Sequence, residues 1–345
     1  MPTWNSTRFA LAWLLPVAVA AAAWFSPWAA WATMLGVQVA LALAERLPAL
    51  QHSPAATPQT AWHRACLRLH VPLQAALLGL GLWLVASREP SVWAVLALGL
   101  GVGGVTGSQG ITFAHELGHS RSRLDRTLAW VLMISVNYAH FMVEHYRGHH
   151  PRAATPADPA TARRGESLWQ FLPRTLAGSL ASAWRLEAAQ LRQLRRGWHR
   201  SPLLWSSIVQ AAWLVLLAAW LGPLALLFWI VQSAHAIFLL EAINYIEHYG
   251  LQRRMVGGRH EAFGLMHAWN ADALVTNSMI ANLQRHSDHH LHAWKPYAEL
   301  EPLPGPQLPT GYAGCLFLAS VPPLWFSAMH RRLDGLAAGP APAAA

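Results

Sequence analysis

Six apolar runs constrain the fold of this 345-residue chain more than any other feature. Each is close to the about 20 residues that a helix needs to cross a hydrocarbon core of about 30 Å. Charged residues make up only 12 % of the chain, whereas an ordinary soluble domain contains about 25 %. We therefore predict an all-α integral membrane protein with about six transmembrane helices. The predicted spans are residues 9–25, 27–44, 70–87, 92–114, 203–221 and 223–247.

The positive charges predict how these helices are oriented. The net charge is +9, and Lys295 is the only lysine. Arginines gather in the connectors 45–69 and 147–200, and the second of these has ten arginines against three acidic residues. Because positively charged loops remain in the cytoplasm, both long connectors and both termini are predicted to be cytoplasmic. A charge of this kind on an apolar chain indicates membrane orientation rather than nucleic-acid binding.

The ends of the chain limit the predicted domain. The first apolar run follows Arg8 and has no clear small-residue cleavage site, so we interpret it as a retained helix rather than a cleaved signal peptide. Residues 1–334 are predicted to form a single integral-membrane domain. The Gly-, Ala- and Pro-rich residues 335–345 are predicted to be a disordered low-complexity tail.

Nine histidines in four short clusters carry the functional signal. A neutral imidazole is a common ligand for iron, zinc and copper, and nine exceed the three or four that one zinc ion takes. Cys66 and Cys315 provide neither a disulfide framework nor a multi-thiolate metal site. The pattern predicts two metal ions close together. Their predicted ligands are His115, His119, His145, His149, His150, His248, His286, His289 and His290.

Helix geometry explains how these clusters can meet. A helix from Ser91 to His119 would be about 42 Å long at about 1.5 Å per residue. It would carry His115 and His119, four residues apart on one face, beyond the hydrocarbon core. The apolar run Thr127–Val143 is predicted to be re-entrant or interfacial, because a span there would put the first two clusters on opposite sides of the membrane. All four clusters are thus predicted to meet on the cytoplasmic side.

Two polar residues within the last span are candidates for supporting the site. Glu241 and Asn244 precede His248 by seven and four residues, so all three share one stripe of a helix. A carboxylate inside a membrane helix is costly and normally functional. We interpret Glu241 as a residue that orients a ligand imidazole, with Asn244 as a second candidate for the same role.

The histidine clusters are also compatible with two other kinds of protein, a zinc metalloprotease and a metal transporter. HELGH alone also fits a zinc metalloprotease with Glu116 as general base, but such a site would leave six histidines unused. A metal transporter would place ionisable residues along a path through the spans, whereas here they collect at one interface. His140 and His235 stay undecided. Interfacial or loop positions are assigned to His52, His63, His70, His199, His260, His267, His292 and His330.

The sequence resembles the membrane-bound alkane 1-monooxygenases, which are integral-membrane non-haem di-iron hydroxylases, over roughly residues 95–330. Fatty-acid desaturases share three histidine boxes but lack NYxEHYG and the LQRHxxHH tail leading into LPTGY. Ser120, where the family often has lysine, and Pro151 depart from the pattern without removing a ligand. The matching stretches are GITFAHELGHS, EHYRGHHPRAATPADPATARRGESLWQFLPR, EAINYIEHYGLQR, NLQRHSDHHLHAWKPYAEL and PLPGPQLPTGYAG.

The resemblance implies that the nine histidines hold two iron ions. The implied reaction is O2-dependent terminal hydroxylation of medium- or long-chain n-alkanes to primary alcohols, in the inner membrane of a bacterium with the site on the cytoplasmic side. The implied electron donor is a rubredoxin, supplied by a rubredoxin reductase. The alternatives are hydroxylation of aromatic methyl groups, as in xylene monooxygenases, and, less favoured, fatty-acid desaturation.

The electron donor must be a separate polypeptide, because a rubredoxin-type centre needs four thiolates and this chain has two cysteines. The arginines of the 147–200 connector, among them Arg192, Arg195 and Arg196, are predicted to attract such an acidic carrier. The alternative is that these arginines only fix the topology and bind anionic lipid head groups.

Overall fold

The structure, a computed structural model, describes residues 3–338. Within that range, six helices are long and apolar enough to cross a membrane. This confirms the predicted all-α, multi-pass membrane architecture, and each helix contains or closely matches a predicted span. The six are Trp4–Phe25 (α1, η1 and α2), Pro27–Ala44 (α3), Ala61–Arg88 (α4), Val92–His119 (α5, η3 and α6), Pro202–Trp220 (α11) and Gly222–His248 (α12).

Shorter elements connect and cap these spans. In the first half they are η2 (Pro48–Leu50), α7 (Arg123–Ser135), α8 (Phe141–Glu144), η4 (His145–His149) and α9 (His150–Arg152). The middle and last parts contain α10 (Leu168–Gln193), η5 (Trp198–Arg200), β1 (Met255–Val256), β2 (Arg259–His260), η6 (Leu265–His267), α13 (Leu274–Met279), α14 (His286–Leu291), η7 (Tyr297–Glu299), α15 (Tyr312–Ser320) and α16 (Pro322–Ala338). The strands pair antiparallel as a small hairpin.

Two of the spanning helices, α3 and α11, begin with a serine N-cap followed by proline. Proline occupies the first turn of α3, and the Ser26 hydroxyl accepts a hydrogen bond from the backbone amide of Trp28 at 3.2 Å. The start of α11 repeats this arrangement, with Pro202 in the first turn and the Ser201 hydroxyl accepting from the amide of Leu204 at 3.1 Å. Proline suits this position because a backbone N–H in the first turn of a helix has no partner within the helix, so nothing is lost when proline lacks it. The caps explain why the spans begin where they do.

The fourth span runs through the middle of the bundle and packs closely against its neighbours. A side chain at Gly101 would overlap the backbone of Ala30 in α3, and one at Gly107 would overlap Ala236 in α12. Small residues permit such close approach between membrane helices. The span is one continuous helix with a π-helical segment, η3 (Thr106–Ile111), inserted before the HELGH stretch.

The apolar run Thr127–Val143 is not a continuous helix. It divides into α7 and α8, separated by a turn at Asn137, which has a φ of 55°. Neither piece is among the helices long enough to span a membrane. The expectation that this run does not form a seventh span is confirmed.

The last helix extends into the predicted tail. α16 continues to Ala338, so residues 335–338 are helical rather than disordered. The rest of the predicted tail, residues 339–345, lies outside the described residues. Alanine has a high helix propensity, so the helix that begins at Pro322 continues past Asp334, where the predicted domain ends.

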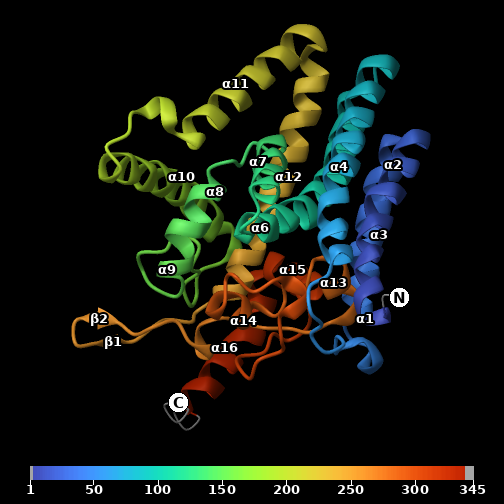
Figure 1. The fold of residues 1–345 in the computed structure, drawn as a ribbon. Coiled ribbons are helices and arrows are strands. Elements are labelled where there is room, and N and C mark those ends of the chain that lie inside the picture. Colours follow the sequence, from blue (N-terminus) through green and yellow to red (C-terminus); the bar gives the residue numbers. More distant parts are fainter. Residues whose placement is uncertain (1–2, 339–345) are drawn as a thin grey trace.

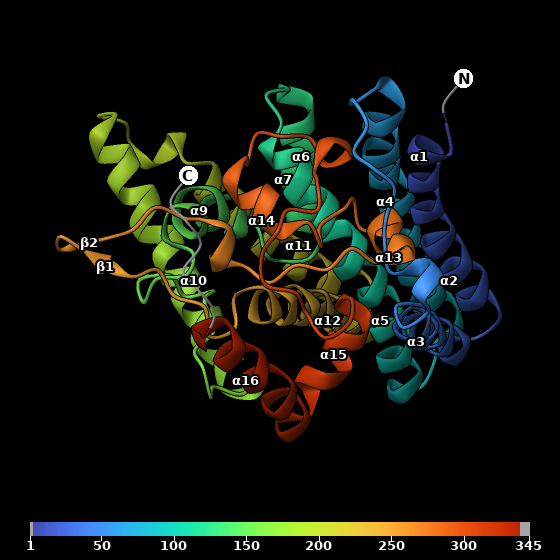
Figure 2. The same cartoon turned by 90° about the horizontal axis from the view of Figure 1, so that it is seen from below.

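The spans and the short elements occupy opposite ends of the molecule. In Figure 1, α2, α3, α4, α11 and α12 extend toward one end, whereas α9, α13, α14, α15 and α16 gather at the other. The view from that second end shows α6, α9 and α14 next to one another and the β1–β2 hairpin projecting outward (Figure 2). Three of the four histidine clusters lie at least partly on these elements, and the fourth lies at the end of α12.

Candidate metal centre

The nine predicted ligands come together as two adjacent groups. Within each group, one potential ligand atom from every member lies within 4.8 Å of the others. These are the only groupings of this kind found among the described residues, and both consist solely of histidine. The first histidine group contains His115, His119, His145, His150 and His289, and the second contains His149, His248, His286 and His290.

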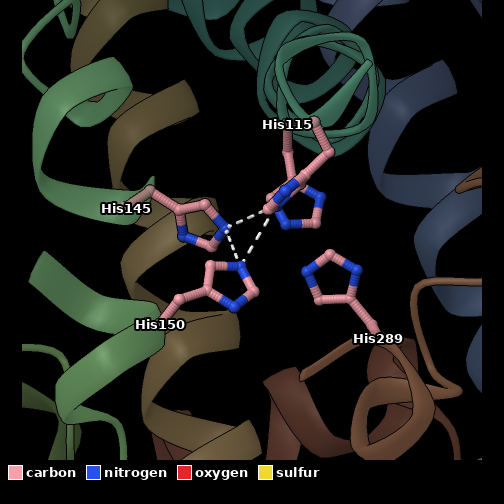
Figure 3. A group of neighbouring side chains, drawn as sticks. His115, His145, His150 and His289 are labelled. Carbon is pink, nitrogen blue, oxygen red and sulfur yellow. Dashed lines mark hydrogen bonds between the residues drawn. The ribbon is translucent and has the colours of Figure 1, made fainter. Parts of the chain in front are cut away.

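Three segments far apart in the sequence build the first histidine group. Figure 3 shows the labelled rings converging from α6, from the stretch from η4 into α9, and from α14. The Nε2 atom of His150 lies 3.0 Å from that of His145 and 3.1 Å from that of His119, and the His119–His145 separation is 3.4 Å. HELGH thus delivers both of its histidines to one group, as its four-residue spacing predicts.

The second histidine group joins the end of α12 to η4 and α14. The Nε2 atoms of His286 and His248 lie 3.2 Å apart, and those of His149 and His290 lie 3.3 Å apart. The two groups adjoin, since the ring centroids of His150 and His290 are separated by 4.6 Å. His248, a single histidine in its stretch of sequence, is therefore fully integrated in the site.

A π-helical turn decides how the second cluster is divided. In an α-helix, His145 and His149 would share a face because they are four residues apart. Here residues His145–His149 form the π-helix η4, which is wider and is closed by i to i+5 hydrogen bonds. His145 consequently pairs with His150, five residues on, in the first group, while His149 turns to the second. Such turns are frequent at functional sites.

Burial keeps these imidazoles in the form that binds metal. Seven of the nine are buried, and His119 and His150 are partly buried. Burial, reinforced by neighbouring imidazoles, lowers the pKa of His145, His150, His286, His289 and His290 well below the usual histidine value. At neutral pH these rings are therefore neutral, and each has a lone pair available for a metal.

The donor set fits a pair of metal ions. Two nitrogens bound to one ion at about 2.1 Å are separated by about 3.0 Å at a right angle and about 3.4 Å at the tetrahedral angle, and the Nε2 separations given above span this range. The Nε2 atom of His289 is buried without a hydrogen-bond partner in the part of the chain that the structure describes. A buried polar atom normally has a partner, so this nitrogen indicates a missing ligand.

Two buried carboxylates lie behind imidazoles of the second histidine group. Asp158 Oδ2 lies 2.9 Å from Nδ1 of His149 and accepts a hydrogen bond from the Thr161 hydroxyl at 2.6 Å. Burial alone would raise the pKa of Asp158, but His149 and these hydrogen bonds outweigh it and lower the pKa to about 2. In the same group, Oε1 of Glu247 lies 3.3 Å from Nδ1 of His286, although the two are not aligned for a hydrogen bond. A carboxylate behind a ligand imidazole fixes its orientation.

The interpretation of Glu241 as an orienting partner is not supported by its hydrogen bonds. Its carboxylate accepts from the hydroxyls of Tyr138 at 2.7 Å and Thr175 at 2.8 Å, and from Asn244 at 3.3 Å. It does line a small pocket beside His149. The Glu241 carboxylate faces Thr175 of α10 and not an imidazole. Among the described residues, Asp158 and Glu247 are the carboxylates that lie next to imidazoles of the site.

Asp158 and Glu247 were missed by reasoning from the sequence. Asp158 follows His149 by nine residues in a non-helical loop, so no periodicity connects them. Glu247 directly precedes His248, and neighbouring residues of an α-helix face directions about 100° apart. The only signal was that both lie in the stretches quoted above for the family resemblance.

The glycine of HELGH permits the first two clusters to pack together. The Tyr146 hydroxyl donates a hydrogen bond to the carbonyl oxygen of His115 at 3.0 Å, and the Tyr146 ring lies against the edge of the His119 ring at 4.6 Å. A side chain at Gly118 would overlap this hydroxyl. The close contact between α6 and η4 therefore requires glycine at this position.

The two departures from the family pattern have structural roles. The Ser120 hydroxyl donates to Asp125 at 2.7 Å in the loop that ends α6. The carbonyl oxygen of Pro151 accepts from Arg253 at 3.1 Å, which ties α9 to the base of the β hairpin. Both positions stay close to the site without contributing a ligand.

The remaining histidines lie outside both groups. His235 is bonded through Nδ1 to the carbonyl oxygen of Leu100 at 2.7 Å. His140 lines the small pocket beside Glu241, and its Nε2 has no partner among the described residues. His267, which was assigned to a loop, accepts through its carbonyl oxygen from Nδ1 of His248 at 3.2 Å. It supports a predicted ligand through its backbone rather than its ring.

The group around HELGH is larger than a zinc metalloprotease needs, because such an enzyme adds only a third ligand to the two histidines of HELGH. Three further histidines complete their group, and the carboxylate of Glu116 accepts a hydrogen bond from the backbone amide of Tyr297 at 3.0 Å. The proposed general base is thus engaged by a distant loop. The geometry favours the dinuclear interpretation over the zinc metalloprotease.

An apolar cavity lies among the spans, and several of its lining residues precede predicted ligands by a few positions in the sequence. Its lining includes Ile111 and Thr112, about one turn before His115, and Ile243, which is five residues before His248. Leu283, three residues before His286, also lines the cavity. Met34 of α3 lies among the residues on the other wall.

Comparison with known proteins gives a consistent result. The sequence model of the fatty acid desaturase family matches residues 91–315. Alkane 1-monooxygenase 2 of Pseudomonas aeruginosa is 38 % identical over 326 residues, which cover 91 % of this chain and 85 % of that protein. An alkane 1-monooxygenase of Pseudomonas putida is 38 % identical over 284 residues, covering 81 % and 70 %. The hydroxylase component of a xylene/toluene monooxygenase of Pseudomonas putida is 29 % identical over 265 residues, covering 75 % and 70 %.

These relationships extend over most of the chain, and the desaturase match alone includes the HELGH, EHYRGHH, NYIEHYG and LQRHSDHH stretches. Identity to the alkane 1-monooxygenases exceeds identity to the xylene/toluene enzyme. Six spanning helices and two all-histidine groups agree with this assignment. The chain belongs to the alkane 1-monooxygenase family and is an oxidoreductase of the monooxygenase class.

Proposed function

We propose that this protein hydroxylates the terminal carbon of medium- or long-chain n-alkanes at a histidine-ligated pair of iron ions. The observation that carries the proposal is the gathering of all nine predicted histidines into two adjoining groups. An apolar cavity, lined by residues three to five positions before predicted ligands, supports it. The balanced reaction is RCH3 + O2 + 2 e⁻ + 2 H⁺ → RCH2OH + H2O. When bound, the iron pair supplies the redox chemistry that activates O2.

The residues of the chain have three tasks in this reaction. The two histidine groups hold the metals, and Asp158 fixes the His149 ring through Nδ1. The apolar cavity aligns the alkane so that its terminal methyl group lies toward the ligand-bearing ends of α6 and α12. Its apolar walls exclude water from the reacting carbon, and alkanes partition into lipid next to the spans. Holding the chain in one orientation favours attack at the terminal carbon.

The direct test is turnover by the purified protein. With a rubredoxin, its reductase and n-alkanes from octane to hexadecane, we expect primary alcohols by gas chromatography and about two irons per chain by elemental analysis. Active protein that contains one zinc and no iron would contradict the iron assignment. Faster oxidation of xylene than of any alkane would favour the aromatic alternative.

The electron donor in this proposal is a separate acidic iron–sulfur carrier of the rubredoxin class. The chain has only two cysteines, both buried and free, and cannot hold a four-thiolate centre. Of the ten connector arginines, four are already paired: Arg147, Arg152, Arg164 and Arg174 contact Glu187, Glu144, Asp334 and Glu166 respectively. The positive surface open to a carrier is therefore smaller than the sequence count indicates.

The proposed orientation places the histidine end of the bundle in the cytoplasm of a bacterial inner membrane. The arginine-rich connectors 45–69 and 147–200 support it. Reporter fusions to the C-terminus are expected to show cytoplasmic activity, with a fusion in the 88–91 connector giving the opposite result. An external C-terminus would overturn this orientation.

A further inference from the structure

A basic depression of about 550 Å³ opens onto one of the predicted metal ligands. It lies between the start of α4, the loop after α6 and the loop before η7. His119, a partly buried member of the first histidine group, forms part of its lining. The depression therefore provides a route from the surface to the site that does not cross the apolar spans.

Positive charge dominates the lining of this depression. Arg64, Arg68, Arg121 and Lys295 line it, against Glu116 and Asp125. Both carboxylates are engaged, because Glu116 accepts from the Tyr297 amide and Asp125 pairs with Arg68 at 2.7 Å.

Two of these cations are available to a partner. Neither Arg64 nor Arg121 takes part in an ion pair within the described residues, and Arg121 is exposed. A concave surface lined by one sign of charge attracts a partner of the opposite sign and raises its rate of association.

An exposed aromatic side chain stands beside these charges. Trp294 lines the depression and is 69 % exposed. Tryptophan is strongly enriched among the residues that dominate the energy of protein interfaces. Trp294 and the free cations together provide the features of a protein docking surface, an aromatic anchor within a charged rim.

The second histidine group is covered where the first is open. The Phe263 ring stacks on the His290 ring at 4.7 Å, and the Arg253 guanidinium lies 5.3 Å from the centre of the Phe263 ring. Electron transfer weakens steeply with distance, so a carrier gains from docking where a ligand imidazole lies near the surface. The His119 side meets that requirement.

We propose that the basic depression lined by Arg64, Arg121 and Trp294 is the docking site of the acidic iron–sulfur carrier, and that electrons enter on the His119 side. This inference rests on the proposed function. Two reduced carriers, each oxidised by one electron, supply the two electrons that the reaction above consumes. The arginines at the end of α10, which the sequence favoured, then serve another role.

The test compares two double charge reversals. Arg64→Glu/Arg121→Glu removes the proposed dock, and Arg192→Glu/Arg196→Glu makes the same change at exposed arginines of the connector. We expect the first pair to raise the KM for reduced rubredoxin about 10-fold and to weaken binding of oxidised rubredoxin similarly, with alkane KM unchanged. The second pair should leave both values near wild type. Added salt should raise the wild-type KM and reduce the difference between variants.

Further variants separate docking from folding. Arg64→Lys/Arg121→Lys should retain rubredoxin binding, whereas Trp294→Ala should weaken it. Enzyme reduced chemically beforehand should form equal amounts of alcohol in a single turnover in all variants, because that assay does not use the dock.

The outcomes distinguish the dock from the proposed function. If the connector pair alone weakens rubredoxin binding, or if both pairs do so equally, the location is refuted. If neither pair changes binding, the arginines of the depression serve the membrane or another ligand, and the proposal is wrong. If chemically reduced wild-type protein forms no alcohol, the proposed function fails, while the binding measurements still decide whether rubredoxin docks here.

Discussion

His289→Ala is expected to abolish alkane hydroxylation and to lower the metal content of the purified protein. His289 is buried, and its Nε2 has no hydrogen-bond partner among the described residues, so its only evident role is to bind a metal. His286→Ala should have the same effect through the second histidine group. Loss of a ligand leaves a metal ion under-coordinated. Activity should therefore fall by more than the about 10–100-fold that is lost when a residue hydrogen-bonded to a ligand is replaced.

The choice of control follows from the structure. His63 was assigned an interfacial or loop position, but it is fully buried and accepts a hydrogen bond from the Thr60 amide at 3.0 Å, so its replacement would disturb the start of α4. His260 lies exposed on β2 and contacts neither group. His260→Ala should therefore keep full activity and metal content. A fully active His289→Ala protein would remove this residue from the site.

Asp158→Asn is expected to weaken metal binding by about 10–100-fold while preserving the size of the side chain. The carboxylate accepts from His149, from the Thr161 hydroxyl and from the backbone amide of Ala160 at 3.1 Å. An amide at this position carries no charge and has only one acceptor oxygen, so it cannot satisfy all three donors. The measurement is competition with a chelator, which reports metal affinity independently of turnover.

Glu241→Gln provides the matched comparison. Its carboxylate is equally buried but bonds to Tyr138, Thr175 and Asn244 rather than to an imidazole. We expect this variant to retain metal nearly as well as wild type. If Glu241→Gln loses metal as readily as Asp158→Asn does, Glu241 supports the site as the sequence suggested, and the supporting role does not belong to Asp158 alone.

The sequence by itself determined the features that depend on local chemistry. Span length follows from hydrocarbon thickness, so the six helices could be placed from apolar runs alone. The pairing of His115 with His119 follows from the α-helical repeat. The nine candidate ligands could also be named from the sequence, because clustered imidazoles in an apolar chain have few uses other than metal binding.

Only the tertiary structure decided how these residues are combined. The π-turn at η4 sends His145 and His149 to different groups, although their spacing predicts one face. Asp158 reaches His149 through a loop, and Glu247 of α12 lies beside His286 of α14, so no helical repeat connects either pair. The depression at His119 is built from residues of α4, α6 and the 294–296 loop. Contacts between distant segments depend on how helices pack, and packing is set by the whole chain rather than by any local stretch of it.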